Sequence, residues 1–105
     1  MVLIRVVVAD PGVDGPARSR ADAVARALRD AGMEVVRTHD TSPAALARAV
    51  VQEDADAVHP AGADAAAVRE LTARLAAEKA ENVLVSDPEN APADVAAAIR
   101  THLGS

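Results

Sequence analysis

Short runs of β-branched residues alternate along this 105-residue chain with longer stretches of helical periodicity. The strand candidates are residues 3–8, 33–37, 56–59 and 83–85. The helix candidates are residues 17–31, 43–52 and 64–79, with a last one that begins near residue 92. Each connection between strand candidates is long enough to return in parallel, which places helices on both faces of an open sheet. The alternation therefore predicts an α/β fold with a parallel sheet of about four strands.

Several residues mark the ends of the predicted helices. Gly32 lies where the left-handed residue after a helix belongs, and Ser42 followed by Pro43 is typical of a helix start. Asp64 is the N-cap candidate of the next helix. These markers and the apolar periodicity predict the same helix boundaries.

Composition narrows the class of protein. The chain has no cysteine and no aromatic residue, so it offers no disulfide, thiolate metal site or thiol nucleophile, and its core must be aliphatic. A net charge of −5 with scattered basic residues argues against a nucleic-acid surface. No apolar run reaches the roughly 18 residues of a membrane span, and residues 1–9 are too short for a secretory leader. We expect one cytoplasmic domain over residues 1–105 that binds neither nucleic acid nor membrane.

The first half of the chain follows a known sequence pattern in one continuous register. The matching segments are RVVVA at 5–9, Pro11-Gly12, Asp14-Gly15, ARALRDAGMEV at 25–35, Thr38, Ser42-Pro43 and residues 52–56. They resemble the cobalamin-binding domain of methylmalonyl-CoA mutases over a little more than half the chain, and the resemblance weakens beyond Val58. It implies a flavodoxin-like (Rossmann-like) open parallel sheet with helices on both faces and the strand order 2-1-3-4.

The loop after the first strand candidate departs from that family at the residue that binds the metal. The family has Asp-x-His-x-x-Gly there, in which the histidine binds cobalt and the aspartate orients the imidazole. The corresponding residues here are Asp14, Gly15, Pro16, Ala17, Arg18 and Ser19. Asp14 is retained, but Pro16 stands in the ligand's place and has no lone pair for a metal. Because Asp-Gly is also a common turn pair, a purely structural role for Asp14 stays open.

Two further segments differ where the family accommodates the nucleotide tail of cobalamin. His59-Pro60-Ala61-Gly62 replaces a Ser-x-Leu segment after the third strand, and Ser86-Asp87 replaces glycines after the fourth. The carboxylate of Asp87 would oppose the phosphate of the tail. By position, the resemblance gives the pocket residues as Asp14, Gly15, Pro16, His59 and Ser86. We expect no bound cofactor, with cobalamin held without a loop histidine as the alternative.

The chain is also shorter than the family's domain near its end. It passes from residues 83–85 almost directly to one last helix, as though a strand and a helix were missing. In the order 2-1-3-4 this strand would be an exposed edge without charge or proline, and such edges are usually paired or covered. We therefore expect the edge to pair with a second copy, giving a homodimer or other homo-oligomer, or with a mutase-like partner chain.

Three polar residues at the predicted carboxyl ends of strands form a separate candidate site. Asp10, His39 and His59 lie where open α/β sheets bind ligands. Strand spacing alone separates His39 from His59 by about 9–10 Å, so each is interpreted first as a solvated histidine. His102, in the last turn of the final helix candidate, suits the helix dipole.

Three functions agree with these residues. No Ser/His/Asp order, phosphate-binding loop or metal-ligand spacing is present, so the favoured function is a non-catalytic domain derived from a cobalamin-binding module. Such a domain would be a structural or regulatory partner of a mutase-like protein. The second is a genuine binder of cobalamin or another small ligand in the crevice at the carboxyl ends of the strands. The third is a small enzyme that uses Asp10, His39 and His59.

Overall fold

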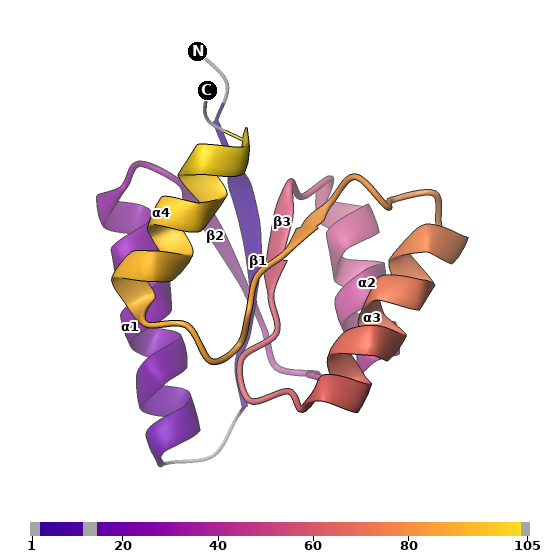
Figure 1. The fold of residues 1–105 in the computed structure, drawn as a ribbon, viewed down its shortest axis with the longest axis horizontal. Coiled ribbons are helices and arrows are strands. Elements are labelled where there is room, and N and C mark those ends of the chain that lie inside the picture. Colours follow the sequence, from indigo (N-terminus) through magenta and orange to yellow (C-terminus); the bar gives the residue numbers. More distant parts are fainter. Residues whose placement is uncertain (1–2, 12–14, 104–105) are drawn as a thin grey trace.

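The computed structural model describes residues 3–11 and 15–103, whose path alternates strands with helices (Figure 1). The strands are β1 (Arg5–Ala9), β2 (Glu34–Thr38), β3 (Ala57–His59) and β4 (Leu84–Val85). The helices are α1 (Pro16–Asp30), α2 (Pro43–Glu53), α3 (Ala65–Ala77) and α4 (Pro92–Leu103). All strand pairs are parallel, and the order across the sheet is β2-β1-β3-β4. The predicted α/β fold, an open flavodoxin-like sheet in the order 2-1-3-4, is confirmed.

The sheet is the middle of three layers. α1 and α4 lie side by side on one face, and α2 and α3 cover the other (Figure 1). β1 lies between β2 and β3, and its residues Val6, Val7 and Val8 have no exposed surface. A parallel strand that is covered on both faces has a continuous apolar sequence, which explains the uninterrupted run at 6–9. The helices contribute the largest buried aliphatic side chains, which are Leu28, Leu46, Leu71, Leu75 and Ile99.

The helix ends follow the local chemistry that the sequence indicates. Ser42 Oγ accepts a hydrogen bond from the Ala45 N–H at 3.2 Å, and Asp64 Oδ1 accepts one from the Ala67 N–H at 2.8 Å. Gly32 follows α1 with a φ of +86°, a conformation that glycine adopts without strain. None of the helices in the described part of the chain has both the length and the apolar character needed to cross a bilayer.

The segment between α3 and α4 differs from the prediction in two places. α3 ends at Ala77, two residues early, because Lys79 takes a left-handed φ of +59°. β4 lacks Val83, because the Val83 N–H bonds back to the Ala80 carbonyl oxygen in a turn. β4 is therefore a two-residue edge strand, while the five-residue β2 forms the opposite edge of the sheet.

Candidate functional site at the carboxyl ends of the strands

The strand register gathers the polar candidates on one face of the sheet. Val8 of β1 is paired with Arg37 of β2 and with His59 of β3, so these three side chains point the same way. Arg37 also reaches Asp22 of α1, which identifies this face as the one that α1 covers. Asp10, two residues beyond Val8, continues the same row past the end of β1. The carboxyl ends of the strands thus present their polar side chains beneath α1.

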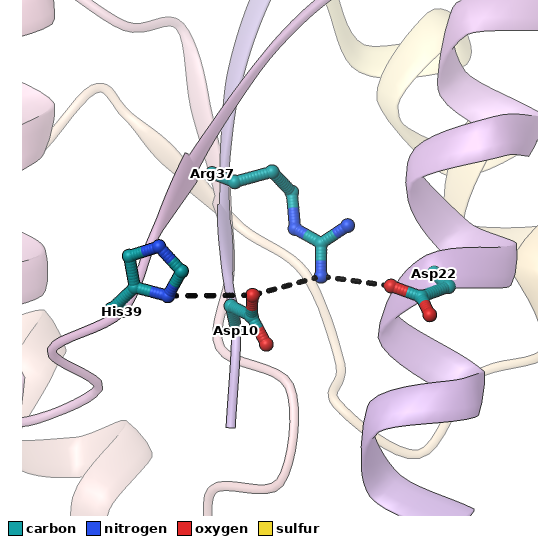
Figure 2. Close-up of polar contacts among 4 residues, drawn as sticks. All are labelled: Asp10, Asp22, Arg37 and His39. Carbon is teal, nitrogen blue, oxygen red and sulfur yellow. Dashed lines mark hydrogen bonds and ion pairs between the residues drawn. The ribbon is translucent and has the colours of Figure 1, made fainter. Parts of the chain in front are cut away.

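Asp10, Arg37, His39 and Asp22 form a chain of charged contacts, which we call the Asp10 cluster (Figure 2). Arg37 Nη2 lies 3.6 Å from Asp10 Oδ2 and 3.1 Å from Asp22 Oδ1. His39 Nδ1 lies 3.5 Å from the same Asp10 oxygen. The Asp10 side chain is only 8% exposed, whereas that of His39 is 88% exposed. The arrangement places one guanidinium between two carboxylates, one of them buried.

The Asp10 cluster ties three elements together. The Asp10 N–H also donates to the Thr38 carbonyl oxygen at 2.8 Å, which extends the β1–β2 ladder past the end of β1. A buried carboxylate is costly unless a cation and hydrogen bonds compensate it, and Arg37 supplies the cation. The cluster therefore holds the ends of β1 and β2 against α1. His39, at its rim, is solvated as the sequence predicted.

His59 makes the second polar contact on this face. Its Nδ1 lies 2.7 Å from Ser86 Oγ, and the Ser86 hydroxyl donates to the Val58 carbonyl oxygen at 3.3 Å. His59 is 2% exposed and Ser86 is 5% exposed. The interpretation of His59 as a solvated histidine is therefore wrong. β3 is an inner strand covered on both faces, and a short strand candidate does not reveal that position from its own residues.

Burial sets the protonation state of His59. Desolvation of the charged imidazole lowers the pKa of His59 from 6.5 to about 4, and the nearby Asp87 carboxylate opposes part of this shift. The side chain is therefore neutral at pH 7. A neutral imidazole keeps one nitrogen as a donor and one as an acceptor, so the bond to the Ser86 hydroxyl forms without a buried charge.

Pro16 and Gly15 have a structural explanation at the start of α1. Pro16 is the first helical residue and is exposed, a position that suits its fixed φ and missing N–H. Gly15, the N-cap, has a φ of +134°, and its carbonyl oxygen accepts the Ser19 N–H at 3.0 Å. Asp14 lies outside the described residues. Neither Gly15 nor Pro16 can bind a metal through its side chain, so these two residues do not fit a cobalt ligand.

The structure divides the predicted site residues into separate groups. Asp10 contacts His39, whereas His59 bonds to Ser86. The sequence interpretation missed Arg37 and Asp22, which complete the first group. A signal for Arg37 does exist, because a charged residue in a β-branched strand must find a partner if the strand packs beneath a helix. Among residues 3–11 and 15–103, no three histidine or acidic side chains converge to hold a metal ion.

A small pocket lies at the switch point between β1 and β3. It has a volume of about 330 Å³, and its walls come from the segments after β1 and β3 and from the first turns of α1, α2 and α3. Apart from Thr41 and Asp64, the lining is proline, alanine, glycine and leucine. Asp64 already accepts the Ala67 N–H as an N-cap. This volume is near the lower limit for small-molecule pockets, about 300–1,000 Å³.

Comparison of the sequence with protein-family models gives no match, and comparison with curated proteins gives none. The resemblance to the cobalamin-binding domain stays a prediction that rests on the residues quoted for it.

Proposed function

We propose that this chain is a non-catalytic domain of the cobalamin-binding type that has lost its cofactor site and serves as a structural or regulatory partner of a mutase-like protein. The supporting observation is the buried contact between His59 Nδ1 and Ser86 Oγ at 2.7 Å. In the family that the sequence resembles, these two segments flank the channel for the nucleotide tail. Here their side chains bond to each other instead.

The segments that follow β3 and β4 oppose cofactor binding in two ways. First, a tail inserted between the ends of β3 and β4 would have to break the bond and leave a buried imidazole unsatisfied, at a cost of about 1–3 kcal/mol. Second, Asp87 follows directly and adds a carboxylate where the tail would carry its phosphate. Pro16 offers no ligand from below. The His59–Ser86 contact, the Asp87 carboxylate and Pro16 each oppose a different part of the cofactor, so all three weaken its binding.

The same geometry argues against the enzyme alternative. Its three residues do not form one constellation, since His59 is engaged with Ser86 while His39 stands in solvent beside Asp10. A pKa of about 4 also makes His59 a weak base at neutral pH. A mutase-like partner would be cytoplasmic, and the proposal places this domain with it.

The partner in this proposal meets the domain at the β4 edge. β4 pairs with β3 on one side, and its other side is the end of the sheet in the described residues. The two occupants expected from the sequence are a second copy of the chain and a mutase-like partner chain. A strand added at this edge would continue the sheet.

Titration of the protein with hydroxocobalamin, followed in the visible spectrum, tests the loss of the cofactor site. We expect no saturable change for the natural protein and none for Pro16→His, because a restored ligand does not reopen the segment between His59 and Ser86. A stoichiometric change with the natural protein would overturn the proposal. A change with Pro16→His alone would assign the loss to the ligand and leave the tail site open.

A second candidate is a small-ligand binder that uses the 330 Å³ pocket between β1 and β3. The pocket supports it because parallel α/β sheets bind ligands at this switch point. Ala67→Trp, at a partly buried residue of the lining, would fill the pocket and abolish such binding. Thermal stability in the presence of small apolar and phosphorylated compounds measures it, and a compound that stabilises the natural protein but not Ala67→Trp would favour this function.

A further inference from the structure

The outer side of β4 presents unpaired backbone groups in a regular row. The Leu84 N–H donates to the Asp56 carbonyl oxygen at 3.1 Å, and the Ser86 N–H donates to the Val58 carbonyl oxygen at 3.0 Å. Because N–H and C=O groups along a strand point alternately to its two sides, the carbonyl oxygens of Val83 and Val85 and the Val85 N–H face away from β3. These groups can pair with an added strand.

A groove lies at the carboxyl end of this edge, next to α3, and we call it the β4 groove. It has a volume of about 480 Å³ and lies between the start of α3 and the segment from Val85 to Glu89. Its apolar lining includes Val68 of α3, Val85 and Pro88. The groove is larger than the pocket at the β1–β3 switch point. An extended segment paired with β4 would place alternate side chains into it.

The charges around the β4 groove are mostly negative. Asp64, Asp87 and Glu89 supply three carboxylates and Arg69 one guanidinium, a net charge of −2 at pH 7. Asp64 caps α3, and Asp87 Oδ1 accepts the Glu89 N–H at 2.8 Å, so two of the carboxylates are held in place. Asp87 and Glu89 are both exposed beside the end of β4. A segment with positive charge next to its paired residues would be attracted here.

We infer that the β4 groove binds an extended segment of a partner chain, with small apolar side chains at the residues that pair with β4 and basic side chains on either side. This inference deepens the proposed partnership and rests on it for the identity of the partner. Backbone pairing to Val85 supplies the register, the apolar lining accepts alternate side chains, and Asp87 and Glu89 select basic residues.

A second copy of the chain is the weaker occupant on grounds of charge. A twofold pairing of β4 with itself would bring two grooves together, each with a net charge of −2, between chains that each carry −5. β4 is also only two residues long, and a strand pair of that length contributes little of the roughly 1,200–2,000 Å² of a stable interface. A basic segment of a different chain avoids the charge repulsion, and the lining of the groove can hold its side chains in addition to the short pairing with β4.

The test uses two synthetic peptides and the full-length ¹⁵N-labelled protein at low salt. Both peptides have a core of alternating valine and threonine, one with two lysines at each end and the other with two glutamates. We expect saturable amide shifts at Val68 and at residues 83–89 with the lysine peptide, and at least tenfold weaker binding of the glutamate peptide. Equal affinity for the two peptides, or shifts elsewhere only, would overturn the inference.

Two matched pairs of variants separate backbone pairing from charge. Val85→Pro removes the outward N–H and should weaken the lysine peptide at least tenfold. Val35→Pro removes the corresponding outward N–H of β2, since the Glu34 N–H bonds inward to Ile4. It should have no effect on peptide binding.

The second pair of variants tests charge. Glu89→Gln should weaken binding of the lysine peptide about threefold, whereas Glu81→Gln, exposed and outside the groove, should not. Glu89→Gln leaves every described backbone hydrogen bond intact, so it still tests the preference of the groove for basic segments if Val85→Pro unfolds.

The outcomes distinguish this inference from the proposed function. A dimer by sedimentation, with β4 amides that shift with protein concentration in the absence of peptide, would assign the groove to a second copy and overturn the basic segment. A saturable hydroxocobalamin spectrum would overturn the loss of the cofactor site without changing the peptide result. Lysine-peptide binding with no cobalamin binding is the combination expected here.

Discussion

The two edge strands of the sheet, β2 and β4, differ in length and in charge. β2 is five residues long and has charged side chains that are engaged, since Glu34 Oε1 lies 2.8 Å from Arg5 Nε and Arg37 bridges Asp10 and Asp22. β4 has no charged residue and only two residues, with a groove beside it. Charged side chains discourage the pairing of an added strand with β2, and the shortness of β4 limits such pairing at the other edge. The comparison shows that side-chain ion pairs accompany the long edge strand β2, whereas the short edge strand β4 has none.

The largest effect should come from His59, beside β4, whose protonation in acid lowers the stability of the folded protein. Its pKa is about 4 in the folded protein and near 6.5 in the unfolded chain, so between these values the unfolded chain binds the proton first. The stabilisation is complete above about pH 6.5 and is lost as the pH falls toward 4, a change of up to about 3 kcal/mol. The difference in urea unfolding free energy between the natural protein and His59→Asn should show this slope. A pH-independent difference would contradict it.

The second largest effect on stability should come from Arg37, on the β2 side of the sheet. Arg37→Ala leaves the buried Asp10 carboxylate without its guanidinium and should lower the unfolding free energy by about 2 kcal/mol, less than for a fully buried pair because the Arg37 side chain is 23% exposed. Urea denaturation measures the loss. Asp22→Ala is the matched control, with an effect below about 1 kcal/mol because its side chain is 55% exposed. Equal losses from the two variants would show that Asp10 does not need this partner.

Ser86→Ala should have a smaller effect on the β4 side. It removes the hydroxyl that bonds to His59 Nδ1 and should cost about 1–2 kcal/mol, since the lost bond is buried. The variant should also shift the His59 imidazole resonances in NMR spectra and leave those of His39 and His102 unchanged. Unchanged His59 resonances would show that the hydroxyl is not bonded to the ring in solution.

The smallest effect should come from the outer ion pair of β2. Glu34→Ala removes a contact between side chains that are 37% and 40% exposed and should change the unfolding free energy by about 0.5 kcal/mol or less. If charge also protects this edge from pairing, Glu34→Val should bring concentration-dependent association that Glu34→Gln does not. Sedimentation of both variants measures this. Two monomeric variants would show that the charge of Glu34 does not protect this edge from pairing.

The capped helix starts and the end of α1 were predictable because their determinants are local, whereas the end of α3 was not. Ser42 and Asp64 cap the helices that follow them, and Gly32 ends α1, through contacts within a few residues of the chain. The order of the strands came from the resemblance rather than from the residues, and the structure agrees with it. Pro16 is likewise explained locally, as the first residue of α1.

The alternation of strands and helices, the caps and the aliphatic core could be predicted from the sequence, because periodicity and cap chemistry act over short distances. The surroundings of the polar residues depended on how distant segments pack against one another. His59 is buried because β3 lies inside the sheet, and its partner is 27 positions away in the chain. Arg37 meets Asp10 and Asp22 only because β2, β1 and α1 pack together. The type of a residue indicates which hydrogen bonds or ion pairs its side chain needs. The residues that supply them are known only when the packing of distant segments is known.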